Sequence, residues 1–79
     1  MDQKVVLQTL DTSTGKHVFQ ICQDSGLRLP VVYDDLGHLI SKGLVKEGAT
    51  KIIHGRRRPL YYLTEAGFQK KVGTDGQLG

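Results

Sequence analysis

The sequence predicts an α+β fold in which three helices are followed by a two-stranded β-ribbon and a short last helix. Apolar residues recur at helical spacing in three segments before residue 43, and two β-prone runs follow within residues 44–63. A chain of 79 residues is long enough for one small domain. We expect this domain to cover residues 1–72, and the Gly-rich residues 73–79 to form a disordered tail.

The first two helices are expected on either side of a polar segment. Asp2 can cap a helix over residues 3–11, and Ser13 or Thr14 can cap the next one. The second helix carries an apolar stripe and ends near Gly26, because glycine readily takes the left-handed conformation that stops a helix. The stripe consists of Val18, Ile21 and Cys22, with Phe19 on its flank.

The third helix is expected from Pro30, at the first helical position where proline is tolerated, to Lys42, with Gly43 closing it. Its apolar face consists of Val32, Leu36, Leu39 and Ile40, and its other face shows Val31, Tyr33, Asp34, His38 and Ser41. Gly37 inside this helix costs about 1 kcal/mol relative to alanine, which indicates close packing or close approach of a partner.

The ribbon is expected to pair residues 44–53 with residues 59–63, and its tip carries Gly55 followed by Arg56, Arg57 and Arg58. A two-stranded ribbon is marginal alone, so the rest of the chain should form a body beneath it. Adjacent guanidinium groups on an exposed turn repel one another and favour an anionic partner such as nucleic acid phosphate. The alternative is a solvated basic turn that serves solubility.

The ribbon is expected to lead into a last short helix. Thr64 can cap this helix from Glu65 to about Val72, and Phe68 and Val72 are expected to close over the body. Tyr61 and Tyr62 alternate faces in the return strand, so one ring should be core and the other should flank the ribbon.

The formal net charge of +3 is segregated along the chain. Three basic and five acidic residues lie before Lys42, a net charge of −2, whereas eight basic and three acidic residues lie from Lys42 onward, a net charge of +5. The basic surface therefore belongs to the ribbon and to the residues after it.

The order of the elements is that of a helix-turn-helix with an appended wing. The third helix ends in a Leu-x-x-x-Gly-Leu-Val pattern, and the return strand continues into Leu-Thr-x-x-Gly. The residues that form these patterns are Leu39, Gly43, Leu44 and Val45, then Arg58, Tyr61, Tyr62, Leu63, Thr64 and Gly67. In them, and over about residues 10–68, the chain resembles the winged helix-turn-helix regulators of the MarR and PadR type.

The resemblance implies a transcriptional regulator that binds double-stranded DNA, with residues 30–42 as the recognition helix in the major groove. The Arg-rich wing would then contact the backbone or the adjacent minor groove. The residues expected to contact DNA are Lys16, Pro30, Val31, Tyr33, Asp34, His38, Lys42, Lys51, Arg56, Arg57 and Arg58, with Lys46 as a further phosphate contact. Asp34 can accept from a cytosine amino group, but Asp34 and Asp35 can equally be solvated surface residues that repel the backbone.

Dimerising members of these families carry long helices around this core. We therefore expect either a minimal regulator or a dimer joined through the first and last short helices. A homodimer is preferred, because a symmetric pair doubles the discrimination of one small module.

Other functions are not favoured by the sequence. His17, His38, His54 and Cys22 lack metal-ligand spacing, and no nucleophile or phosphate-cradling motif is present, so we expect neither an enzyme nor a metal or other cofactor. A single cysteine and the lack of an apolar span or signal pattern favour a cytoplasmic protein. The competing interpretation is a winged-helix module that binds another protein within a larger assembly.

Overall fold

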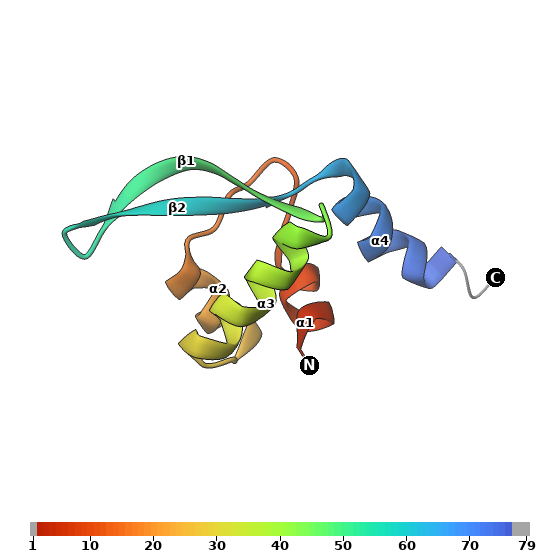
Figure 1. Cartoon of the computed structure of the whole chain (residues 1–79), viewed down its shortest axis with the longest axis horizontal. Coiled ribbons are helices and arrows are strands. Elements are labelled where there is room, and N and C mark those ends of the chain that lie inside the picture. The colour runs from red at the N-terminus through yellow and green to blue at the C-terminus, as the bar shows by residue number, and fades with distance from the viewer. Residues whose placement is uncertain (1, 77–79) are drawn as a thin grey trace.

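The computed structural model describes residues 2–76, which form four helices and a two-stranded antiparallel sheet (Figure 1). In chain order the elements are α1 (Gln3–Thr9), α2 (Val18–Ser25), α3 (Leu29–Ser41), β1 (Val45–Ile53), β2 (Arg56–Leu63) and α4 (Glu65–Gly76). The first three helices gather beneath the ribbon formed by β1 and β2, whose turn projects at one end of the molecule, and α4 leaves at the other end. The predicted α+β architecture and its order of elements are confirmed.

The core lies between the three helices and the base of the ribbon. The buried apolar residues are Val6, Leu7, Leu10, Val18, Ile21, Val32, Leu36, Leu39, Val45, Tyr61 and Leu63. The stripes predicted on the second and third helices are among them, except that Cys22 is half-buried and Ile40 is exposed. Only the base of β1 joins the core, because residues 46–52 of this strand are all exposed.

The connection between α1 and α2 differs from the prediction. Neither Ser13 nor Thr14 caps α2; the helix begins at Val18, and the Nδ1 of His17 accepts from the backbone N–H of Gln20 at 3.2 Å. The backbone of Lys16 instead exchanges two hydrogen bonds with Tyr61 of β2, at 3.1 and 2.8 Å. This strand-like pairing uses the backbone groups that an earlier helix start would have needed.

The base of the ribbon is hydrogen-bonded to the end of α3. The Oγ1 of Thr64 donates to the carbonyl oxygen of Gly43 at 2.6 Å and accepts from the backbone N–H of Gly67 at 3.0 Å, which caps α4. The backbone N–H of Thr64 also donates to the carbonyl of Leu44 at 3.0 Å. A Cβ at Gly67 would overlap that same carbonyl oxygen, so only glycine fits there. The two sequence patterns at the ends of α3 and β2 therefore form one packed unit.

The two tyrosines of β2 lie as predicted on opposite faces. Tyr61 is buried in the core, while the half-buried ring of Tyr62 lies against Gly15 and Gly48. A Cβ at either glycine would overlap the Tyr62 ring. Gly48 lies where the register of β1 and β2 shifts, which makes room for this ring on the bent ribbon.

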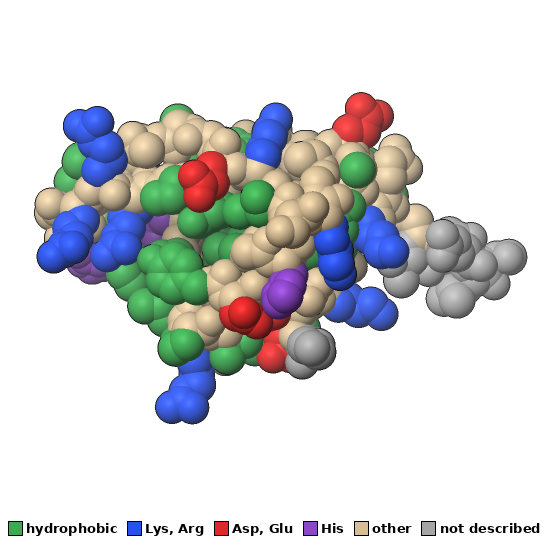
Figure 2. Space-filling model, in the orientation of Figure 1, with side chains coloured by type: hydrophobic (Ala, Val, Ile, Leu, Met, Phe, Trp, Pro, Cys, Tyr) green, Lys and Arg blue, Asp and Glu red, His purple; other side chains and the backbone are tan. Residues whose placement is uncertain are grey.

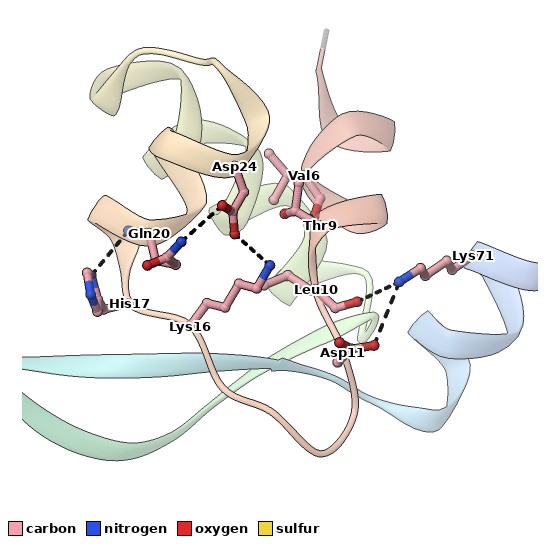
Figure 3. Close-up of polar contacts among 9 residues, drawn as sticks. All are labelled: Val6, Thr9, Leu10, Asp11, Lys16, His17, Gln20, Asp24 and Lys71. Carbon is pink, nitrogen blue, oxygen red and sulfur yellow. Dashed lines mark hydrogen bonds and ion pairs between the residues drawn. The ribbon is translucent and has the colours of Figure 1, made fainter.

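The last helix differs from the prediction in two respects. It continues to Gly76, beyond the predicted boundary at residue 72, and residues 77–79 of the predicted tail lie outside the described residues. Phe68 and Val72 do not close over the body, because their side chains are 41% and 42% exposed. The helix is held through Lys71, whose Nζ donates to the Leu10 carbonyl at 2.9 Å (Figure 3).

Candidate nucleic-acid interface

The ribbon turn consists of His54 and Gly55, both with positive φ angles of 53° and 78°. Two consecutive left-handed residues form the tight turn that suits the twist of a hairpin, and histidine tolerates this region better than most residues. The sequence suggested that the three arginines lie on the turn. In the structure they form the first three residues of β2. Because side chains alternate along a strand, the arginines cannot all face the same way.

Arg58 turns toward the body. Its Nη1 donates to the hydroxyl of Tyr33 on α3 at 3.2 Å, and its Cζ lies 5.1 Å from the centroid of the Phe19 ring on α2. Its Nε is buried and has no hydrogen-bond partner among the described residues. Arg58 therefore joins the ribbon to both helices of the helix-turn-helix.

Arg56 and Arg57 differ from Arg58. Both side chains are exposed, and neither forms an ion pair with a carboxylate within residues 2–76. Lys51 on the paired strand is exposed as well. Figure 2 shows Lys and Arg side chains gathered at the end of the molecule that the ribbon turn occupies in Figure 1. These three cations are therefore available to an anionic partner.

The ring of Phe19 is the centre of a small cluster beneath the ribbon turn. It lies edge-on to His54, with ring centroids 5.5 Å apart, and to His17, at 6.0 Å. Together with the guanidinium of Arg58, these contacts bring the turn against α2. The sequence predicted Phe19 only on the flank of its helix, and no local pattern could have shown that the ribbon packs on it.

The exposed face of α3 carries most of the residues predicted to read DNA. Pro30, Tyr33, Asp34 and His38 are exposed, and Val31 is half-buried. Gly37 lies on the same exposed side, and a Cβ there would meet nothing within 4 Å. Close packing within the chain is thus not the reason for this glycine.

The two acidic residues of α3 have different environments. Asp34 is exposed, and its Oδ2 lies 3.6 Å from the Nε2 of His38 one turn away. Asp35 is only 2% exposed, and its Oδ2 has no hydrogen-bond partner within the described residues. Burial raises the pKa of Asp35, and the nearby carboxylates of Asp2 and Asp34 raise it further. Asp35 is therefore not a solvated surface residue, contrary to the expectation.

Two predicted phosphate contacts already have partners in the chain. The Nζ of Lys16 donates to the Oδ2 of Asp24 at 2.7 Å, and this hydrogen bond, with one from Gln20, lowers the pKa of Asp24 (Figure 3). The Nζ of Lys42 donates to the Oε1 of Gln3 at 2.8 Å. Their contacts with DNA remain predictions that would require these side chains to change partners.

Arg28 is a candidate that sequence reasoning missed. It immediately precedes α3 and is exposed, and within residues 2–76 its side chain forms no hydrogen bond or ion pair. If α3 enters the major groove as predicted, a cation at the start of this helix is placed to contact phosphate. Its position next to the predicted helix start was the available signal.

The metal-ligating side chains of the described residues form no cluster. No three His, Cys, Asp or Glu side chains among them are arranged to hold a metal ion, and burial raises the pKa of the Cys22 thiol, which makes it less reactive. None of the helices in this part of the chain is long and apolar enough to cross a membrane.

No family model and no curated protein sequence matches the chain. Solved structures do match. A PadR-family transcription regulator from Clostridium difficile R20291 has a TM-score of 0.79 at 18% identity, with 98% of this chain and 86% of that chain covered. FabT of Streptococcus pneumoniae, solved in complex with DNA, has a TM-score of 0.75 at 14% identity, covering 95% and 51%. The chain has the winged helix-turn-helix fold.

A possible HxlR-family transcriptional factor from Thermoplasma volcanium GSS1 is similar to the same extent, with a TM-score of 0.76, 20% identity, and coverage of 98% and 67%. These structural matches confirm the predicted fold. In this winged helix-turn-helix the β1–β2 ribbon is the wing, and α2 and α3 are the helix-turn-helix. The chain spans about half the length of FabT.

Proposed function

We propose that the chain binds double-stranded DNA as a transcriptional regulator, with α3 in the major groove and the wing on the backbone or the adjacent minor groove. One observation carries the proposal. The hydrogen bond between Arg58 and Tyr33 joins the exposed side of α3 to the wing. The helix that reads bases and the cations that hold phosphates are therefore adjacent, as contact with one duplex requires.

The chemistry of the two parts suggests a division of roles. Lys51, Arg56 and Arg57 on the wing supply sequence-independent attraction to the phosphate backbone. Val31, Tyr33, Asp34 and His38 on α3 offer an apolar contact, a hydroxyl, an acceptor and a ring nitrogen to base edges. Affinity would then depend on the wing and sequence specificity on α3.

Titration of a fluorescent duplex of random sequence tests the proposal. We expect binding with a Kd of about 10 μM at about 50 mM salt, weakening steeply toward about 200 mM salt, because counterions are released from the phosphates. A selection from random duplexes then provides the preferred sequence. The absence of any binding at low salt would overturn the proposal.

The second candidate function is binding to another protein. The exposed side chains of Ile40, Phe68 and Val72 favour it, because the phosphate backbone of DNA offers no apolar surface for them. The same titration separates the two functions, since a protein-binding module would not bind a random duplex at low salt.

We also propose that the chain is a homodimer joined through α1 and α4. Phe68 and Val72 lie one turn apart on α4, and Val5 on α1 is 40% exposed, so these helices present apolar side chains to solvent. Sedimentation at micromolar concentration should show a dimer for the natural protein and a monomer for Phe68→Glu. Gln69→Glu, which adds the same charge at an exposed neighbouring position, should stay dimeric. A monomeric natural protein, with and without DNA, would contradict the proposal.

A further inference from the structure

Few contacts within the outer half of the wing fix its position. In β1 every side chain from residue 46 to residue 52 is exposed, and Ile52 near the turn is 61% exposed. A two-stranded ribbon without a covered face is only marginally stable in water. Its angle to α3 must therefore be set by side chains that reach back from the ribbon to the helices.

The side chains of His54 and Arg58 extend from the wing to the helices, and both contact Phe19. The His54 ring lies edge-on to it at 5.5 Å, and the Arg58 guanidinium lies over its face at 5.1 Å. Arg58 also donates to the hydroxyl of Tyr33 at 3.2 Å. We call Phe19, Tyr33, His54 and Arg58 the wing clamp. It connects the turn and β2 to α2 and to α3 at once.

The contacts of Arg58 depend on the shape of its side chain as well as on its charge. A guanidinium is planar, so it can stack on an aromatic ring while donating hydrogen bonds in its own plane. An ammonium group is a compact point charge without a stacking face, so lysine would keep the charge and lose this combination. Lysine and arginine are therefore not equivalent at residue 58.

The surroundings of Arg58 also distinguish it from a free phosphate ligand. Its Nε is buried, and its Nη1 is used by Tyr33. The Cζ is covered on one side by the Phe19 ring. The neighbouring Arg56 and Arg57 have no such contacts and are exposed. The three arginines thus divide into two that face solvent and one that is held against the helices.

We infer that Arg58 is a positioning residue, which sets the angle of the wing relative to α3 through Phe19 and Tyr33 so that Arg56 and Arg57 meet the phosphate backbone. The inference rests on the proposed DNA binding for its consequence. The clamp itself is a property of the free protein.

The clamp is tested without DNA by amide hydrogen exchange of wing residues 51–53 and 56–58. We expect exchange about tenfold faster in Arg58→Lys, because a stacking contact and one hydrogen bond are lost. Arg57→Lys, the same change at the exposed neighbour, should exchange as the natural protein does. Tyr33→Phe, which removes only the hydroxyl, should give an intermediate increase. The far-ultraviolet circular dichroism spectrum reports independently whether the variant is folded. If folded Arg58→Lys exchanges its wing amides at the same rate as the natural protein, the inference is overturned.

The consequence is tested by the salt dependence of duplex binding. Arg58→Lys should weaken binding about tenfold and lower the slope of log K against log salt although the charge is retained, because Arg56 and Arg57 then no longer meet the phosphate backbone. Arg57→Gln should lower that slope by about 0.9. A normal affinity for Arg58→Lys, together with a lowered slope for Arg58→Gln, would show a direct phosphate contact and overturn the positioning role. If the natural protein binds no duplex, the proposed function fails, while the exchange experiment still decides whether the clamp exists.

Discussion

The two ends of the wing are held in different ways. At its base, close-fitting groups leave no space: Thr64 binds Gly43, Gly67 lies against Leu44, and the ring of Tyr62 lies against two glycines. Toward its turn the wing is exposed, charged and connected to the helices by the few side chains of the wing clamp. We therefore expect the base to matter most for folding and the outer half to matter most for the proposed binding.

The close packing at the base of the wing explains the two sequence patterns that resemble those of the MarR and PadR type. The Leu-x-x-x-Gly-Leu-Val and Leu-Thr-x-x-Gly patterns lie far apart in the chain, but their residues meet at the base of the wing. The two patterns therefore arise from packing at the base of the wing. A pattern of this kind, shared with a family, indicates the fold more strongly than the function. The proposed DNA binding would depend instead on exposed residues, such as Arg56 and Arg57.

The largest expected effect is at the base. Gly67→Ala would place a Cβ into the carbonyl of Leu44, and we expect the free energy of unfolding to fall by about 3 kcal/mol, at the upper end for overpacking. Urea unfolding measures the change. Gly73→Ala is the matched control, because Gly73 lies in the same helix and a Cβ there meets nothing within 4 Å. An equal effect at both positions would mean that close packing is not what requires Gly67.

At the outer half the expected loss is in binding rather than folding. Replacing Arg56 and Arg57 together by alanine should leave urea unfolding almost unchanged, because both side chains are exposed. The slope of log K against log salt should fall by about 1.8 for each bound chain, or 0.9 per phosphate contact. Measurement of duplex binding at several salt concentrations checks this. An unchanged slope would remove the wing from the proposed interface.

The buried carboxylate of α3 should limit stability at neutral pH. Burial raises the pKa of Asp35 above its ordinary value of 3.8, so the folded protein holds this proton more tightly than the unfolded chain. Stability is therefore lost as pH rises from that value through the raised pKa, and the loss persists above it. Asp35→Asn, which removes the charge, should raise the free energy of unfolding by about 1 kcal/mol at neutral pH and by less in acid.

Thermal unfolding at about pH 3 and about pH 7 measures this dependence on protonation. Glu47→Gln is the control, because Glu47 is exposed and is not among the charges that shift the pKa of Asp35, so it should show little effect at either pH. Equal stabilisation of Asp35→Asn at both pH values would show that the charge on Asp35 is not responsible.

A smaller gain in stability is expected at Gly37. Alanine there enters open space in the middle of α3, so we expect the free energy of unfolding to rise by about 0.5–1 kcal/mol. Duplex binding should weaken, because the added methyl group would meet a closely approaching duplex. Urea unfolding and duplex titration of the same variant provide both values. Normal binding by a stabilised variant would show that DNA does not approach α3 at this residue.

Much of the fold could be predicted because it depends on local signals. The helices around Ile21 and Leu36 follow from apolar periodicity, and their ends follow from Gly26 and Gly43. The start of α2 could not be predicted in this way. The hydroxyl groups of Ser13 and Thr14 are good local caps, but Lys16 pairs with β2, and that pairing joins residues far apart in the sequence.

The candidate site was predictable as a set of residue types but not as an arrangement. Adjacent arginines predict an anionic partner, yet only the fold shows that Arg58 turns to Tyr33 and Phe19. Adjacent aspartates suggest a shared surface, yet only the fold shows that Asp35 is buried while Asp34 is not. In both cases side chains that are adjacent in sequence point in different directions from the same helix or strand. The surroundings of each side chain are formed by other parts of the chain.

By itself the sequence determined the α+β class, the order of its elements, the third helix and the concentration of positive charge on the wing. These depend on periodicity, turn residues and composition, which are read along the chain. The tertiary structure alone decided how the wing is held, which of its arginines are exposed, and that Phe68 and Val72 face solvent. These depend on contacts between distant segments, whose energies come from packing that no single stretch of sequence contains.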